Sequence, residues 1–231
     1  MRILKMILDC IMPPYEGVRE LESMTPKGLI EAIALDKESA KPRSLPVDGL
    51  VVAFPYRARL AKAAIVEIKT NMNRRVVRTL AEATYIKVCE HLARFAASSP
   101  DGSLPILAPM PMTKKRRRER GWNQCELICR ELDQIDGKNT GGRTFIYIEN
   151  ALCRTRETED QVGMDKTERA ANMKGSFGAS MSADKKGCEI VRGRDVIILD
   201  DVATTGATLR EAERAALSGG ARNVLLVSIG Y

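Results

Sequence analysis

VIILDDVATTGATLREA, residues 196–212, is the stretch that decides the fold of this 231-residue chain. Its first four residues form an apolar run typical of a strand that is buried on both faces, and two acids, Asp200 and Asp201, follow at once. A short segment of small and hydroxyl residues, 202–208, then leads into a helical pattern. Because ligands bind at the carboxyl ends of strands in open α/β sheets, this junction is the predicted site.

The segment after the two acids has the composition of an anion-binding loop. Backbone N–H groups at a helix N-terminus attract anions, and Thr204, Thr205 and Thr208 can add hydroxyl donors. Gly206 lets the backbone approach an oxygen closely. Two other phosphate motifs, GxxxxGK[ST] and GxGxxG after a strand, are absent. A plain strand–turn–helix with a threonine cap does not require two adjacent acids, so we expect the acids to take sugar hydroxyls and the loop to take a phosphate.

Outward from this stretch, apolar strand-like runs alternate with helical patterns, which predicts an α/β fold: a mainly parallel twisted sheet flanked by helices. Residues 150–194 are polar, with one short helix expected at 165–173, and residues 1–48 form an appended segment with a helix at 27–38. The expected strands are 49–56, 104–112, 144–149, 195–201 and 223–231, and the expected helices are 60–70, 76–97, 123–135 and 208–217.

The net charge of +7 is concentrated in one place, since Lys114–Arg120 holds six positive residues and one negative residue. Three interpretations stay open for this segment. It could be a solvated mobile loop, a loop facing a diphosphate, or a nucleic-acid contact in which Trp122 stacks on a base.

The six cysteines form no CxxC pair, and Cys125 and Cys129 have the spacing of neighbours on one helix face. We expect them to be reduced core residues and not metal ligands. The start, MRILKMILDC, has too short an apolar run for a secretion signal, and no run approaches the ~18 residues of a membrane span. These features favour a cytoplasmic protein without a membrane partner.

Three motifs resemble known proteins. The segment 196–209 resembles the phosphoribosyl pyrophosphate (PRPP) signature of type I phosphoribosyltransferases. RERGWNQCELICREL (118–132) and RTRETEDQVGMDKTERAANMKGSF (154–177) are similar to two segments of the ComF family of competence-associated proteins. The motifs stand in family order and cover roughly residues 50–231. The zinc segment common at the N-terminus of that family is not expected here, because only Cys10 stands in that region.

The resemblance implies a role for each matching residue. Asp200 and Asp201 would bind the ribose hydroxyls, and the turn after Met110–Pro111 would approach the diphosphate. The 5′-phosphate would be held by Ala203, Thr204, Thr205, Gly206, Ala207 and Thr208. Candidates for the diphosphate side are Lys69, Arg118, Arg120, Asn123 and Gln124. The mobile loop would carry Thr158, Gln161, Arg169 and Asn172. Mg²⁺ would be the cofactor, held through PRPP with help from the two acids and not by protein side chains alone.

The first functional hypothesis is therefore a phosphoribosyltransferase of PRPP or a related ribose 5-phosphate, with the acceptor and the oligomeric state open. The alternatives are a protein that binds single-stranded DNA and uses the fold as a binding module, and a PRPP-sensing regulator. Since the chain ends on a strand at Tyr231, residues 1–48 are expected to supply any hood over the acceptor, and 49–231 to form the phosphoribosyltransferase-like domain.

Overall fold

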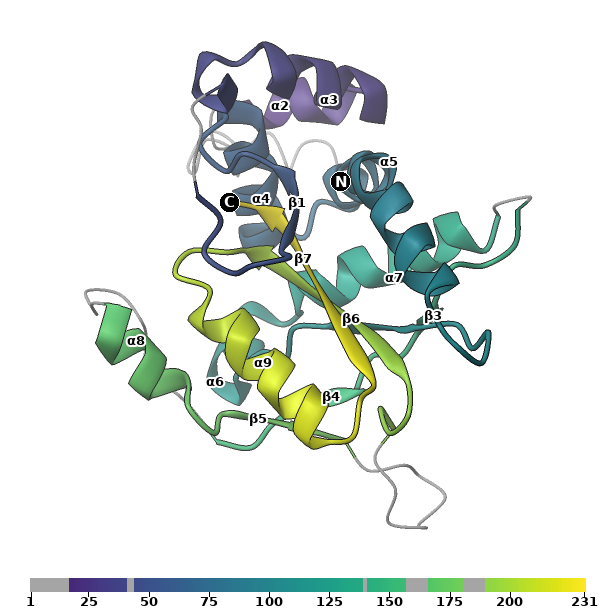
Figure 1. Ribbon diagram of the computed structural model, residues 1–231. Helices are drawn as coiled ribbons and strands as arrows, with labels where there is room; N and C mark the ends of the chain where they lie inside the picture. The colour runs from purple at the N-terminus through teal and green to yellow at the C-terminus, as the bar shows by residue number, and fades with distance from the viewer. Residues whose placement is uncertain (1–16, 41–43, 139–140, 157–165, 181–189) are drawn as a thin grey trace.

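The computed structural model describes residues 17–40, 44–138, 141–156, 166–180 and 190–231. Within them, five strands form one parallel sheet in the order β1-β7-β6-β2-β3 (Figure 1). The strands are β1 (Val51–Phe54), β2 (Ile106–Pro109), β3 (Ile146–Tyr147), β6 (Asp195–Val202) and β7 (Asn223–Gly230). The predicted fold class is confirmed, and the architecture is consistent with the type I phosphoribosyltransferase fold.

Helices cover both faces of the sheet because its connections run in two directions. The chain passes from β1 to β2 and from β2 to β3 toward one edge, and from β6 to β7 toward the other. Right-handed crossovers then place the helix after β6 on the face opposite to the other helices. These helices are α4 (Arg59–Thr70), α5 (Arg74–Ala97), α6 (Lys114–Arg120) and α7 (Gln124–Asp136) on the first connections, and α9 (Ala207–Ser218) after β6.

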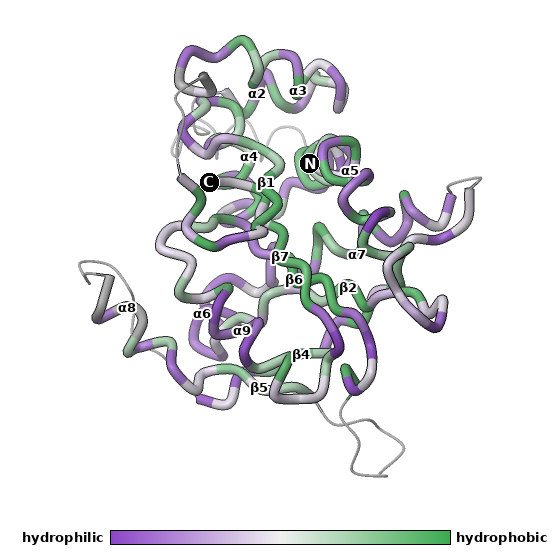
Figure 2. Tube along the Cα trace, viewed as in Figure 1, coloured by the Kyte–Doolittle hydropathy of each residue, from purple (hydrophilic) through white to green (hydrophobic). Residues whose placement is uncertain are grey.

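The core lies along the central strands, where Figure 2 shows β7, β6 and β2 as hydrophobic. From Val196 to Leu199, every side chain of β6 is at most 1% exposed. Both faces of β6 are covered by helices, so its sequence is a continuous apolar run and not an alternation. This burial brings the chain to Asp200 and Asp201 at a fixed point on the edge of the sheet.

A small antiparallel ribbon, β4 (Leu152–Arg154) with β5 (Phe177–Ala179), stands beside the main sheet. The sequence prediction missed it and assigned only a short helix to residues 150–194, which the structure contains as α8 (Lys166–Met173). Each strand has three residues, too few to show a period of two. The ribbon packs on α9 and buries Phe177.

The described part of the N-terminal segment packs on α4 and α5. It contains α2 (Val18–Ser23), α3 (Pro26–Leu35) and the 3₁₀ helix η1 (Lys37–Ala40). Glu20 pairs with Arg59 of α4 at 2.7 Å, and Glu22 accepts a hydrogen bond of 2.7 Å from Asn73. A hood role for residues 1–48 stays a prediction. In the described ranges, no helix is both long enough and apolar enough to cross a membrane.

Candidate functional site

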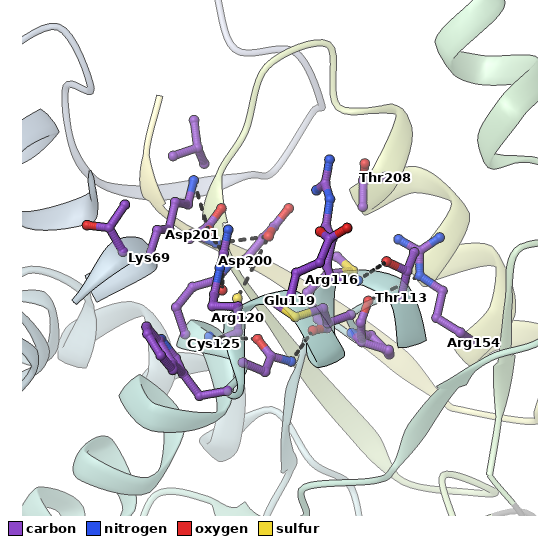
Figure 3. Close-up of a pocket in the computed structure, with 18 of the residues that line it drawn as sticks. Lys69, Thr113, Arg116, Glu119, Arg120, Cys125, Arg154, Asp200, Asp201 and Thr208 are labelled. Carbon is purple, nitrogen blue, oxygen red and sulfur yellow. Dashed lines mark hydrogen bonds and ion pairs between the residues drawn. The ribbon is translucent and has the colours of Figure 1, made fainter. Parts of the chain in front are cut away.

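A cavity of about 980 Å³ opens between the carboxyl ends of β6 and β2. These two strands are neighbours, and their following connections leave toward opposite edges of the sheet. Such a switch point leaves a crevice in which open α/β sheets bind ligands. Figure 3 shows side chains from β6, β4, α4, α6 and α7 around this cavity.

The acids at the end of β6 lie on the floor of the cavity, with relative exposures of 9% for Asp200 and 7% for Asp201. Asp201 Oδ2 lies 3.1 Å from the ammonium of Lys69, which stands at the end of α4. The same oxygen accepts a hydrogen bond from the side-chain amide of Gln124, whose own oxygen accepts one from Arg120. A polar chain thus links three predicted residues, Lys69, Gln124 and Arg120, through Asp201.

Asp200 lies deeper and has weaker partners. Its Oδ1 accepts the backbone N–H of Asp201 at 2.9 Å and lies 3.9 Å from the thiol of Cys125. Burial first, and then the charge of Asp201, raises the pKa of Asp200 well above its ordinary value. Burial and the two neighbouring carboxylates likewise raise the pKa of Cys125, so its thiol stays protonated. Cys125 and Cys129 are free and buried, which places them in the core as their spacing predicted.

The raised pKa of Asp200 predicts a pH-dependent stability. The folded state binds the proton of this carboxyl group more tightly than the unfolded state does. The free energy of unfolding therefore decreases as the pH rises from the pKa in the unfolded state, ~3.9, to the pKa in the folded state. We expect Asp200→Asn to raise the melting temperature more at pH 8 than at pH 5, as measured by thermal unfolding. Asp48→Asn, at an exposed loop position, is the control and should show no such trend. An equal gain at both pH values would contradict the prediction.

The loop after β6 is fastened at both ends. The N–H of Ala203 donates to the carbonyl of Gly230 and to the hydroxyl of Ser228, each at 2.9 Å. Arg210 donates to the Thr205 carbonyl at 2.7 Å and to the Pro46 carbonyl at 2.6 Å. The loop therefore keeps its shape through contacts outside the cavity.

Within this loop, Thr204 and Thr208 line the cavity. Ala203 and Ala207 are buried in the core, while Thr205 and Gly206 do not line the cavity. Gly206 has φ +75° and caps α9. Two hydroxyl groups and the start of α9 therefore border the side of the cavity next to the acids.

The segment Gly121–Gln124 forms hydrogen bonds to two other segments that line the cavity. The Asn123 amide caps α7 by accepting the Cys125 N–H at 3.0 Å, and it donates to the carbonyl of Met110 at 3.0 Å. The indole N–H of Trp122 donates to the carbonyl of Ile68, the residue before Lys69, at 2.8 Å. This hydrogen bond fixes the indole of Trp122, which also lines the cavity.

The basic segment is helical, so its interpretation as a mobile loop was wrong. Thr113 caps α6 by accepting the Arg116 N–H at 3.3 Å, and Gly121 ends it with φ +87°. No residue of α6 is buried. Two arginines on one face of the helix, Arg116 and Arg120, line the cavity.

Not every predicted residue lies in the cavity. Arg118 does not line it. Asn172 lies in α8, and its carbonyl accepts a hydrogen bond of 2.8 Å from Arg156. Arg169 also lies in α8, whereas Thr158 and Gln161, like Cys10, fall outside the described residues.

Two cations of the cavity, Arg116 and Arg154, were not assigned from the sequence. Arg154, in β4, donates from Nε to the Pro111 carbonyl at 3.2 Å, and its guanidinium lies 4.2 Å from the centre of the Phe177 ring. Its charge acts on Asp200, where it lowers the pKa as a minor cause. Arg154 opens one of the family-like motifs, but no role was assigned to it from the sequence. Figure 3 shows it on the far side of the cavity from Lys69.

The carboxylates of the cavity fit a hard cation such as Mg²⁺ that is bound mainly through the phosphates of a ligand. In the described ranges, no group of three or more histidine, cysteine or acidic side chains could hold a metal ion. Mg²⁺ usually binds through one or two carboxylates together with substrate phosphates and water. Asp200 and Asp201 supply that number of carboxylates at the cavity floor.

No protein-family model matches the chain. Comparison with known proteins nevertheless finds relatives. DNA utilization protein YhgH of Escherichia coli O157:H7 is 25% identical over 182 residues, which cover 78% of this chain and 70% of that protein. Competence protein F of Haemophilus influenzae is 28% identical over 138 residues, 59% of this chain and 53% of that protein. Competence protein ComFC of Bacillus subtilis is 32% identical over 115 residues, 50% of this chain and 39% of that protein. The predicted resemblance to the ComF family is confirmed as distant homology.

Proposed function

We propose that this distant homologue of competence and DNA utilization proteins binds PRPP with Mg²⁺ and transfers or hydrolyses its phosphoribosyl group. The observation that carries the proposal is the pair of buried acids, Asp200 and Asp201, beside the loop that begins α9. Acids for hydroxyls and a helix N-terminus for a phosphate are complementary to a ribose 5-phosphate.

The cations of the cavity account for the rest of the ligand. Lys69 and Arg120 lie on one side of the acids and Arg154 on the other, and Arg116 also lines the cavity. PRPP carries its diphosphate on the carbon whose bond breaks, so charge develops on the diphosphate as it leaves. Preorganised guanidinium and ammonium groups stabilise that charge. When bound, Mg²⁺ would neutralise part of the same charge.

A ligand that binds Asp201 must replace contacts that this carboxylate already makes. A ribose hydroxyl that donates to Asp201 competes with the amide of Gln124 and the ammonium of Lys69 for the same oxygen. Lys69, once displaced from Asp201, can pair with the diphosphate. The ion pair therefore holds the lysine near the ligand and orients the carboxylate.

Titration calorimetry of PRPP into the wild-type protein, with and without Mg²⁺, tests the proposal. We expect binding that depends on Mg²⁺, and release of pyrophosphate if the group is transferred or hydrolysed. Binding without pyrophosphate release would favour a PRPP-sensing regulator. A folded protein that binds neither PRPP nor ribose 5-phosphate would contradict the proposal.

Arg154 provides a sharper test. Removing one charge-assisted contact costs about 1.5–3 kcal/mol, so Arg154→Gln should weaken PRPP binding roughly tenfold to a hundredfold. Arg154→Lys should restore only part of the affinity, because lysine cannot reproduce the planar stacking on Phe177. Arg78→Gln, on the exposed surface of α5, is the matched control for the loss of one charge. Equal affinities for Arg154→Gln and Arg78→Gln would remove Arg154 from the site.

A second candidate function is binding of single-stranded DNA, favoured by the exposed cations of α6 and by the relatives' names. Binding to phosphates releases counterions, so the affinity for an oligonucleotide should fall steeply with salt. Neutralising Lys114, Lys115 and Arg117 should flatten that dependence by roughly 0.7 in the logarithmic slope for each phosphate that the variant no longer neutralises. An unchanged slope would exclude α6 as the DNA-binding element.

A further inference from the structure

A second cavity, of about 370 Å³, lies beside the first and has no part in the proposed function. Pro111, Met112 and Asn123 line both cavities, so the turn after β2 separates them. The volume falls within the range of about 300–1,000 Å³ that small-molecule sites occupy. Arg118, which the sequence assigned to the diphosphate and which does not line the first cavity, lines this one.

The charges around the second cavity favour an anion. Its cations, Lys114, Arg117 and Arg118, all come from α6. The two carboxylates in its lining already have cationic partners: Glu126 pairs with Arg117 at 2.6 Å, and Glu149 pairs with Arg130. Neither carboxylate pairs with Arg118, whose positive charge is therefore not balanced within the lining.

Two polar side chains of the second cavity are open to a ligand. Among the described residues, neither Arg118 nor Asn150 has a side-chain hydrogen bond or ion pair, and both are exposed. An arginine fork matches a phosphate, and a side-chain amide offers both a donor and an acceptor.

Apart from Asn123, the rest of the lining is apolar. Pro109 and Leu152 are buried, and the partly buried Pro111 and Met112 lie beside them. Apolar surface of this kind suits a flat ring. Apolar residues together with a side-chain amide and cations are the combination that a base with an attached phosphate requires.

We propose that the second cavity binds a nucleoside monophosphate. Arg118 and Lys114 hold its phosphate, the Asn150 amide contacts the edge of the base, and the base lies on Pro109 and Leu152. The proposal does not rest on the proposed PRPP function, although the two cavities share the turn after β2.

The test is calorimetric titration of AMP and of UMP into the full chain, once without and once with ribose 5-phosphate, the probe of the first cavity. Arg118→Gln should weaken nucleotide binding about tenfold, the effect of losing one charge-assisted contact. Arg116→Gln removes the same charge from the first-cavity face of α6, and Lys115→Gln removes one at a position that lines neither cavity. Both controls should stay within about twofold of wild type, a range that corresponds to less than about 0.5 kcal/mol.

Asn150→Ala gives an independent variant and should weaken AMP and UMP to different extents, because the two bases present different edges. The proposal is overturned if neither nucleotide binds, or if ribose 5-phosphate displaces both completely. Equal weakening by all three α6 variants would also overturn it, since that result indicates general electrostatic attraction. Unchanged binding in both Arg118→Gln and Asn150→Ala would lead to the same conclusion.

Discussion

Replacing both Asp200 and Asp201 with asparagine should weaken PRPP binding by at least about a hundredfold while the protein stays folded. Each carboxylate is buried and can accept charge-assisted hydrogen bonds from a ribose hydroxyl, worth about 1.5–3 kcal/mol each. Asparagine keeps the shape but offers one acceptor oxygen and no charge. Titration calorimetry with PRPP and Mg²⁺ measures the loss, and circular dichroism checks the fold.

The sign of this effect makes it informative. PRPP is an anion, so removing negative charge from the cavity should strengthen its binding if only long-range electrostatics mattered. Glu119→Gln is the matched control, because Glu119 lines the same cavity from α6. We expect Glu119→Gln to leave the affinity unchanged or slightly higher. If the double mutant behaved like Glu119→Gln, the acids would have no direct role.

Gly206→Ala should destabilise the protein by about 2–4 kcal/mol. Gly206 has φ +75°, a conformation that costs an alanine ~1–2 kcal/mol. The added Cβ would also clash with Val47 Cγ2 and lie 3.2 Å from the Pro46 carbonyl, and overpacking of this kind costs about 1–3 kcal/mol. Urea denaturation measures the change in the free energy of unfolding.

The chain offers a matched control for this substitution. Gly49 has φ +73°, but a Cβ there would meet nothing within 4 Å. Gly49→Ala should therefore cost only the conformational part, ~1–2 kcal/mol. Equal costs at the two glycines would show that residues 46 and 47 move aside and do not hold the loop in place.

The central strand and its acids could be predicted because their signals are local. The apolar run of β6 reflects burial on both faces, and Asp200 and Asp201 follow it without a break. The ribbon β4–β5 could not be predicted, because its two short strands are separated by more than twenty residues and pair only through the tertiary fold. Arg154 depends on that ribbon for its position, so it was missed as well.

The basic segment shows how one wrong assignment affects the prediction of a site. The cap signals of α6 are present in the sequence as Thr113 and Gly121, and they predict a helix over the residues between them. In a helix, positions four apart share a face, so Arg116 and Arg120 would have been paired. A loop has no such periodicity, so the loop interpretation could not show that Arg118 lies on a different face from Arg116 and Arg120.

The hydrogen bond from Trp122 to the Ile68 carbonyl has a practical consequence. Trp122 is the only tryptophan of the chain, and it lies at the wall of the first cavity next to the end of α4. Its fluorescence therefore comes from a single known place. A ligand that draws Lys69 away from Asp201 changes the surroundings of this indole, so the protein carries its own optical sensor for occupation of the cavity.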